Sequence, residues 1–90
     1  MRLRGEFIIR EIMDDVVAVP VGSYALEFNG MVVLNAVSKV IWECLESGST
    51  FQDILLAVTN RFDVTQEEAA EDITDFIEQL RMVGLLQEDP

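Results

Sequence analysis

Histidine is absent from this 90-residue sequence, and cysteine occurs once, at Cys44. Without these side chains the chain cannot assemble a Cys–His or Ser–His nucleophilic pair, and it lacks the usual ligands of a structural zinc site. One cysteine also cannot form an intrachain disulfide bond, so nothing indicates an oxidising compartment. We therefore expect no catalytic residue, no metal and no cofactor, and we interpret Cys44 and the nearby Trp42 as packing residues.

Basic residues are also scarce, because six Lys and Arg stand against 17 Asp and Glu, giving a net charge of −11. Nucleic-acid binding and attraction to anionic membranes both depend on clustered basic side chains. We therefore expect neither nucleic acid nor membrane as a partner. The acidic excess is uneven, since residues 61–90 contain two bases and nine acids and so carry −7 of the total.

Long apolar runs are missing as well. Half of the residues are hydrophobic, which is too many for a disordered acidic tail. No run approaches the roughly 20 apolar residues of a membrane-spanning helix, and no apolar segment of signal-peptide length follows Arg2 and Arg4. We expect a cytoplasmic protein that folds as a single domain over residues 1–90, with one modest core.

The first third of the sequence has the composition of β-strands. Residues 7–13 and 15–21 are rich in β-branched side chains and meet at Asp14-Asp15, which predicts a hairpin. Pro20 cannot donate a hydrogen bond to a neighbouring strand, so it marks a strand end or a free edge. Residues 22–28 fit either a short turn of helix or part of a strand.

A third strand is predicted at Met31–Leu34, after the turn signal Asn29-Gly30. It contains no proline and no charge, which are the common devices that discourage another chain from pairing with a sheet edge. Such a strand either docks within its own molecule or accepts a strand from another chain. The sequence pattern alone leaves both possibilities open.

From residue 35 onward, apolar residues recur with the period of α-helices. The pattern predicts three helices, at about residues 36–46, 51–61 and 66–82. Their expected core-facing residues are Val37, Val40, Ile41, Cys44 and Leu45, then Phe51, Ile54, Leu55 and Val58, then Ala69, Ile73, Phe76, Ile77 and Leu80. The fold class is therefore α+β and winged-helix-like, with a small antiparallel three-stranded N-terminal sheet followed by a three-helix bundle of helix-turn-helix type.

Capping residues mark where the predicted helices begin. Asn35, Thr50 and Thr65 are each followed by a helical apolar pattern and are predicted as N-caps. Thr65 has Glu68 three residues later, which is the preferred form of the capping box, whereas Thr50 has Asp53. We therefore expect the better capping box at the start of the third helix.

The third predicted helix is strongly acidic and carries a single base, Arg81. Its acids are Glu67, Glu68, Glu71, Asp72, Asp75 and Glu78. Several of them lie three or four residues apart, so that like charges share a face and repel each other. The pattern fits a solvated acidic face, and it also fits a charged rim for a basic peptide.

Six short motifs follow one another across residues 30–86, and the family resemblance that they carry extends over roughly residues 7–86. They are Gly30-Met31-Val32-Val33-Leu34-Asn35, Ile41-Trp42-Glu43-Cys44-Leu45, Gly48-Ser49-Thr50 with Ile54, Phe62-Asp63-Val64, Asp72-Ile73-x-x-Phe76-Ile77-x-x-Leu80 and Gly84-Leu85-Leu86. In this order and spacing, they resemble the PqqD-like family. These small proteins are named from pyrroloquinoline quinone biosynthesis and are also called RiPP recognition elements.

The resemblance implies a peptide chaperone and not an enzyme. Such a protein binds the leader segment of a ribosomally synthesised precursor peptide by strand addition and presents the peptide to a modifying enzyme, often a radical SAM protein. By matching position, the implied main-chain contacts lie on Met31, Val32, Val33 and Leu34. The implied helical wall beside them consists of Asp72, Ile73, Asp75 and Phe76.

A second interpretation is an acidic winged-helix domain for protein–protein interaction or dimerisation, without a peptide substrate. A homodimer that buried Met31–Leu34 would leave no strand edge for a peptide. The two interpretations therefore differ in what covers the third strand.

Overall fold

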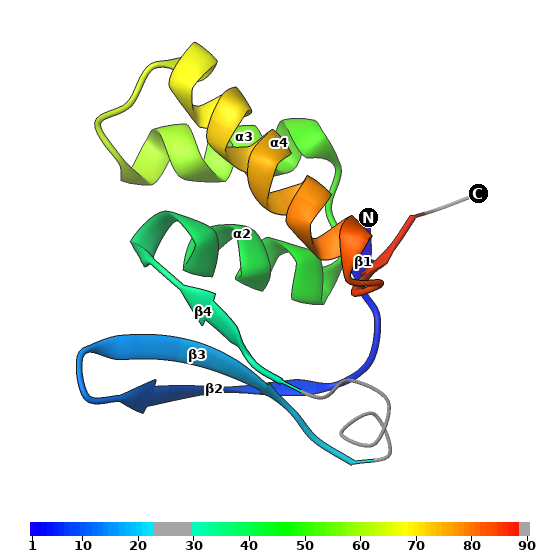
Figure 1. The fold of residues 1–90 in the computed structure, drawn as a ribbon. Coiled ribbons are helices and arrows are strands. Elements are labelled where there is room, and N and C mark those ends of the chain that lie inside the picture. Colours follow the sequence, from blue (N-terminus) through cyan, green and yellow to red (C-terminus); the bar gives the residue numbers. More distant parts are fainter. Residues whose placement is uncertain (23–29, 89–90) are drawn as a thin grey trace.

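A computed structural model of the chain describes residues 1–22 and 30–88 (Figure 1). Strands β2 (Phe7–Ile12), β3 (Asp15–Pro20) and β4 (Val32–Leu34) form an antiparallel sheet in that order. The predicted three-stranded sheet is thus confirmed, and β3 ends at its proline. The expectations for residues 23–28 and for a turn at Asn29 lie outside the described residues.

The hairpin turn lies one residue earlier than expected. Met13 and Asp14 connect the two strands, and Ile12 pairs with Asp15, so Asp14-Asp15 is not the turn. Met13 has a φ of 57°, the left-handed conformation that tight two-residue hairpin turns require. Methionine adopts it less readily than glycine does, and the Met13 side chain is 95% exposed.

The three predicted helices follow as α2 (Ala36–Ser47), α3 (Phe51–Arg61) and α4 (Gln66–Met82). Their predicted N-caps all accept a hydrogen bond from the amide three residues later.

The prediction about the better capping box is wrong. At the start of α3, the Asp53 carboxylate accepts from the Thr50 amide at 3.3 Å and closes the box. At the start of α4, the Glu68 carboxylate accepts from the Thr65 hydroxyl at 3.2 Å. The Glu68 carboxylate therefore bonds to the Thr65 hydroxyl and not to the Thr65 backbone N–H, so the reciprocal capping box is not formed.

Helix α2 lies between the sheet on one side and the pair α3 and α4 on the other (Figure 1). Trp42 of α2 is fully buried and packs edge-to-face on Phe7 of β2, with ring centroids 5.1 Å apart. The rest of the core extends from the sheet through α2 to α3 and α4. It contains Ala18, Leu34, Val40, Ile41, Leu45, Ile54, Val58, Ala69, Ile73, Phe76, Ile77, Leu80 and Leu85. Phe51 departs from its predicted core position, because it is the first residue of α3 and remains exposed.

Two short strands that the sequence analysis did not predict tie the ends of the described chain together. Strand β1 (Arg2–Leu3) pairs antiparallel with β5 (Leu86–Gln87). Leu85, just before β5, is fully buried, and its N–H donates to the Leu80 carbonyl at 2.9 Å. This pairing holds the C-terminal end of α4, and therefore α4 itself, in place beside α2.

Candidate functional site

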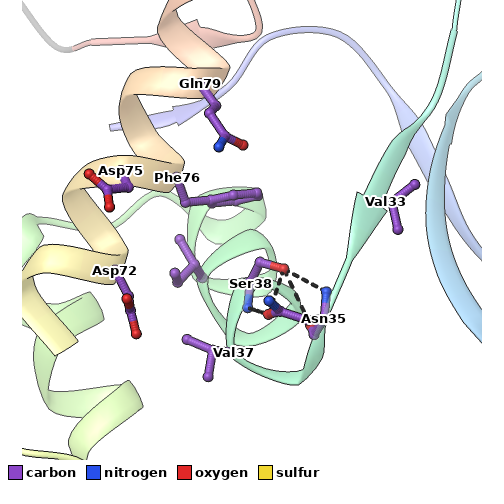
Figure 2. Close-up of a pocket in the computed structure, with 9 residues that line it drawn as sticks. Val33, Asn35, Val37, Ser38, Asp72, Asp75, Phe76 and Gln79 are labelled. Carbon is purple, nitrogen blue, oxygen red and sulfur yellow. Dashed lines mark hydrogen bonds between the residues drawn. The ribbon is translucent and has the colours of Figure 1, made fainter. Parts of the chain in front are cut away.

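A groove of about 280 Å³ lies between β4 and α4, with α2 between these two walls (Figure 2). Three separate elements contribute to it, so the groove exists only in the folded chain. Its lining residues are Val33, Asn35, Val37, Ser38, Ile41, Asp72, Asp75, Phe76 and Gln79.

The α4 wall of the groove is a single face of the helix. Asp72, Asp75, Phe76 and Gln79 follow the i, i+3, i+4, i+7 spacing, which aligns side chains along one helical face. Phe76 is largely buried, and its ring points toward α2, whereas the three polar side chains are exposed. The wall therefore has an apolar base and a polar, partly acidic rim.

The first two turns of α2 supply the floor of the groove. Val37 and Ile41 contribute apolar surface, and the capping box of the helix lies beside them. In this box, Ser38 Oγ accepts from the Asn35 N–H at 2.8 Å, and Asn35 Oδ1 accepts from the Ser38 N–H at 2.8 Å. The floor thus combines an apolar patch with polar groups that already bond to each other.

The hydrogen bonding of β3 determines which backbone groups of β4 face the groove. Residues along an antiparallel strand direct their N–H and C=O alternately to one neighbour and to the other. Val21, which follows β3, donates to the Glu6 carbonyl on the β2 side at 3.0 Å. The odd-numbered residues of β3 therefore bond to β2, and the even-numbered residues Val16 and Ala18 bond to β4.

On β4, Leu34 lies opposite Val16, and Val32 lies opposite Ala18, so both use their backbone groups inside the sheet. Val33 lies opposite Val17 and directs its N–H and C=O outward, to the free edge. Its side chain is 63% exposed. Val33 is therefore the residue of β4 that offers a strand partner both backbone groups.

The rim of the groove is negatively charged and is not neutralised from within. In residues 1–22 and 30–88, the salt bridges join Arg81 to Glu78 and to Glu88, and neither Asp72 nor Asp75 has such a partner. Two exposed carboxylates thus border the groove and are available to a basic side chain.

A family model described as coenzyme PQQ synthesis protein D (PqqD) matches residues 10–86, which include the second half of β2, strands β3 and β4, all three helices and every residue of the groove. The chain belongs to the PqqD family. The expected family resemblance is thus confirmed. A search of curated proteins gives no match.

Two solved structures have the same fold as this PqqD-family chain. One is TbiB1 in complex with the TbiA(beta) leader peptide, which is 26% identical with a TM-score of 0.76, over 100% of this chain and 99% of that chain. The other is a lasso peptide synthetase B1 complexed with the leader peptide, which is 22% identical with a TM-score of 0.71, over 97% of this chain and 96% of that chain. Both similarities extend over nearly the whole of each protein.

The structure brings together half of the predicted site residues. Val33, Asp72, Asp75 and Phe76 all line the groove. The other four do not line it, and the reason is the direction of each backbone or side chain. Ile73 and Leu34 are buried in the core, and Val32 is half-buried against the core. Met31 lies just before the start of β4.

The α2 contribution to the groove was not among the predicted site residues. Val37 and Ile41 carried a helical core signal, and Asn35 carried an N-cap signal, so their sequence patterns indicated only structural roles. Gln79 is one helical turn beyond Asp75 and Phe76 on α4. The i+7 spacing from Asp72 would have placed it on the same face.

The single cysteine lies away from the groove. Cys44 lines a hollow between α2 and α3, together with Ala57 and Arg61. Burial, followed by the nearby Glu43 and Asp53 carboxylates, raises the pKa of the Cys44 thiol. A raised pKa disfavours the thiolate, which is the nucleophilic form, and this agrees with the packing role.

Within residues 1–22 and 30–88, no helix is long and apolar enough to cross a membrane. The same part of the chain contains no group of three His, Cys, Asp or Glu side chains positioned to hold a metal ion.

Proposed function

We propose that this PqqD-family chain binds the leader segment of a ribosomally synthesised precursor peptide and presents the peptide to a modifying enzyme. The leader adds a strand to β4 and lies in the groove between β4 and α4. The observation that carries this proposal is the free edge at Val33, which faces a groove with an apolar patch on its floor. The two structural neighbours, both solved with leader peptides, support it.

Main-chain bonds alone do not provide useful affinity. If the strand extends through Met31, the outward N–H and C=O groups of Met31 and Val33 give up to about four hydrogen bonds, each contributing roughly 0.5–1.5 kcal/mol. Association costs about 4–15 kcal/mol, whereas micromolar binding needs a net free energy of roughly −8 kcal/mol. The leader therefore needs other contacts.

Apolar anchors supply the missing free energy. Side chains of an added strand alternate between its two faces, so every second leader residue faces Val37, Ile41 and Phe76. Burying one large aliphatic or aromatic side chain contributes about 1.5–3 kcal/mol. Several such anchors are needed, together with the main-chain bonds, to offset the cost of association, and Asp72 and Asp75 favour a leader that also carries Lys or Arg.

The chemistry belongs to a separate enzyme in this proposal, and the family resemblance implies a radical SAM protein as one such class. Ser38 provides the hydroxyl group in the groove, and that group is already bonded in the capping box. The lining of the groove also contains no histidine, which is the commonest general base. The chain thus holds the substrate but does not convert it.

Fluorescence polarisation tests the proposal. The probes are synthetic N-terminal segments of the short peptides encoded beside the gene for this chain, with the TbiA(beta) leader as a heterologous comparison. We expect one native leader to bind with a micromolar or lower Kd. Its scrambled version and the core segment of the same precursor should bind much more weakly. Equal binding of leader and scrambled peptide would contradict the proposal.

Sedimentation velocity tests the alternative of a dimerisation domain. We expect a monomer at the concentrations used for peptide binding, because β4 must remain open. A tight dimer that dissociates on Val33 substitution would favour the alternative, since a partner copy would then occupy the same edge.

A further inference from the structure

We propose, on the basis of the leader binding proposed above, that the Asn35–Ser38 capping box sets the register of the leader on β4. In this box Ser38 accepts a hydrogen bond from the Asn35 N–H. That donor would otherwise extend the open edge of β4 toward α2. Ser38 is therefore a positioning residue for the peptide, in addition to being part of the helix cap.

The position of Asn35 in the strand pattern explains why the hydrogen bond from its N–H to Ser38 limits pairing with a peptide. Asn35 follows β4 directly and keeps an extended conformation, with φ −88° and ψ −177°. It also has the same parity as Val33, so alternation would direct its N–H to the open edge. A peptide on β4 would reach this donor next if the donor were free.

The donor is not free, because Ser38 occupies it. Ser38 Oγ accepts from the Asn35 N–H at 2.8 Å, and the Ser38 hydroxyl donates to Asn35 Oδ1 at 3.0 Å. The Asn35 carbonyl accepts from the Lys39 N–H at 2.9 Å. Ser38 is only 8% exposed, so its side of these bonds is largely shielded from solvent.

The leader can therefore pair with Val33, and beyond it toward Met31, but not toward α2. Pairing that extended two residues further in that direction would require the Asn35 donor. A shift of one residue would turn every leader side chain to the opposite face. With pairing toward α2 stopped at Val33 and a one-residue shift disfavoured, the end of the paired segment places the apolar anchors of the leader over Val37 and Phe76.

We call this end of strand pairing at Asn35 the register stop. Residue-resolved amide hydrogen exchange by NMR tests it, with the leader that binds in the polarisation assay as the probe. In the wild-type chain we expect leader binding to slow exchange at Val33 by about tenfold or more, because opening of the added strand then limits exchange. Exchange at Asn35 should stay within about twofold, because its bond to Ser38 exists before binding.

Ser38→Ala removes the acceptor of the Asn35 N–H. In the free variant we expect Asn35 to exchange about tenfold faster, and we expect leader binding to slow it again as an additional strand pair forms. Ser38→Thr keeps the hydroxyl and should restore the wild-type pattern. Asp53→Ala is the matched control, because it removes the equivalent capping bond from α3, outside the groove, and should leave Asn35 unchanged.

Several results would overturn the register stop while leaving leader binding intact. These are new protection of Asn35 in the bound wild-type chain, new protection of Val32 or Leu34 in place of Val33, or identical bound patterns for Ser38→Ala and the wild type. The wild-type pattern decides the question even if Ser38→Ala does not fold. Absence of binding by every leader would instead overturn the proposed function, and the register stop with it.

Discussion

The two edges of the three-stranded sheet differ in what lies beside them. Strand β4 carries no charge, and its outward residue faces a groove that α4 closes on the far side. Strand β2 is longer and carries Arg10 and Glu11, which discourage edge pairing. The comparison shows that an open edge becomes a candidate binding site when a second element places side-chain pockets beside it, because backbone bonds alone do not offset the cost of association.

Proline substitution at the two sheet edges should give the largest difference in leader affinity. Val33→Pro removes the outward N–H of β4 and adds a ring where the leader would pair, so we expect leader affinity to fall about tenfold or more. Glu11→Pro is the matched control, because Glu11 also directs its N–H outward, on the β2 edge, and should leave affinity unchanged. Polarisation titrations measure both variants.

A third proline variant tests the assignment of backbone directions. Val32 directs its N–H into the sheet, so Val32→Pro should lower the melting temperature far more than Val33→Pro does. Circular dichroism melts measure this difference. Wild-type affinity in Val33→Pro, or equal destabilisation by the two substitutions, would contradict the assignment.

Charge reversal on α4 should have a smaller effect. Asp72→Lys and Asp75→Lys should each weaken binding of a leader that carries Lys or Arg by about two- to tenfold, because exposed ion pairs contribute roughly 0.2–1 kcal/mol each. The loss should shrink as salt is added. Glu71→Lys makes the same change in net charge on a residue of α4 that does not line the groove.

The comparison with Glu71→Lys separates local contacts from the overall field of the protein. We expect Glu71→Lys to reduce affinity clearly less than either groove variant. Equal losses for all three, measured by polarisation at low and high salt, would show that net charge acts in place of the groove rim.

The smallest effect is expected beside the other edge. Glu46 lines a hollow there with Leu3 and Phe7, and partial burial, followed by the Glu43 carboxylate, raises the pKa of Glu46. A carboxyl whose pKa is raised by folding stabilises the fold while it is protonated, and this contribution is lost as the pH rises through the folded-state pKa. Glu46→Gln should therefore raise the melting temperature at neutral pH.

The gain from Glu46→Gln should disappear as the pH falls below about 4, where the carboxyl is protonated in both folded and unfolded chains. Calorimetry from acid to neutral pH measures it, and leader affinity should not change, because Glu46 lies outside the groove. A lower melting temperature than the wild type at neutral pH would contradict the stated effect of burial.

The sequence predicted the elements whose signals are local. The N-caps at Asn35, Thr50 and Thr65 and the apolar periods after them were sufficient to place all three helices. The pairing of β1 with β5 was not predicted, because each strand has only two residues and the register joins opposite ends of the described chain. Such a contact depends on where α4 ends in space, which no short motif encodes.

The candidate site was predicted in part for a related reason. Family motifs identified β4 and α4 as its walls, and both walls line the groove. The motifs did not separate Ile73, which faces the core, from Gln79, which faces the groove. They also gave no indication that Ser38 lines the groove, because its bonds to Asn35 and its position in the groove become visible only when α2 packs between the walls.

A chemical-shift map by two-dimensional NMR tests the central claim most directly. The ¹⁵N-labelled chain is titrated with the native leader that binds in the polarisation assay. We predict that the largest shifts lie at Val33 and its neighbours on β4, and along the groove face of α4 from Asp72 to Gln79, with small shifts on β2. Largest shifts on β2, or in the hollow that Cys44 lines between α2 and α3, would contradict leader addition at β4.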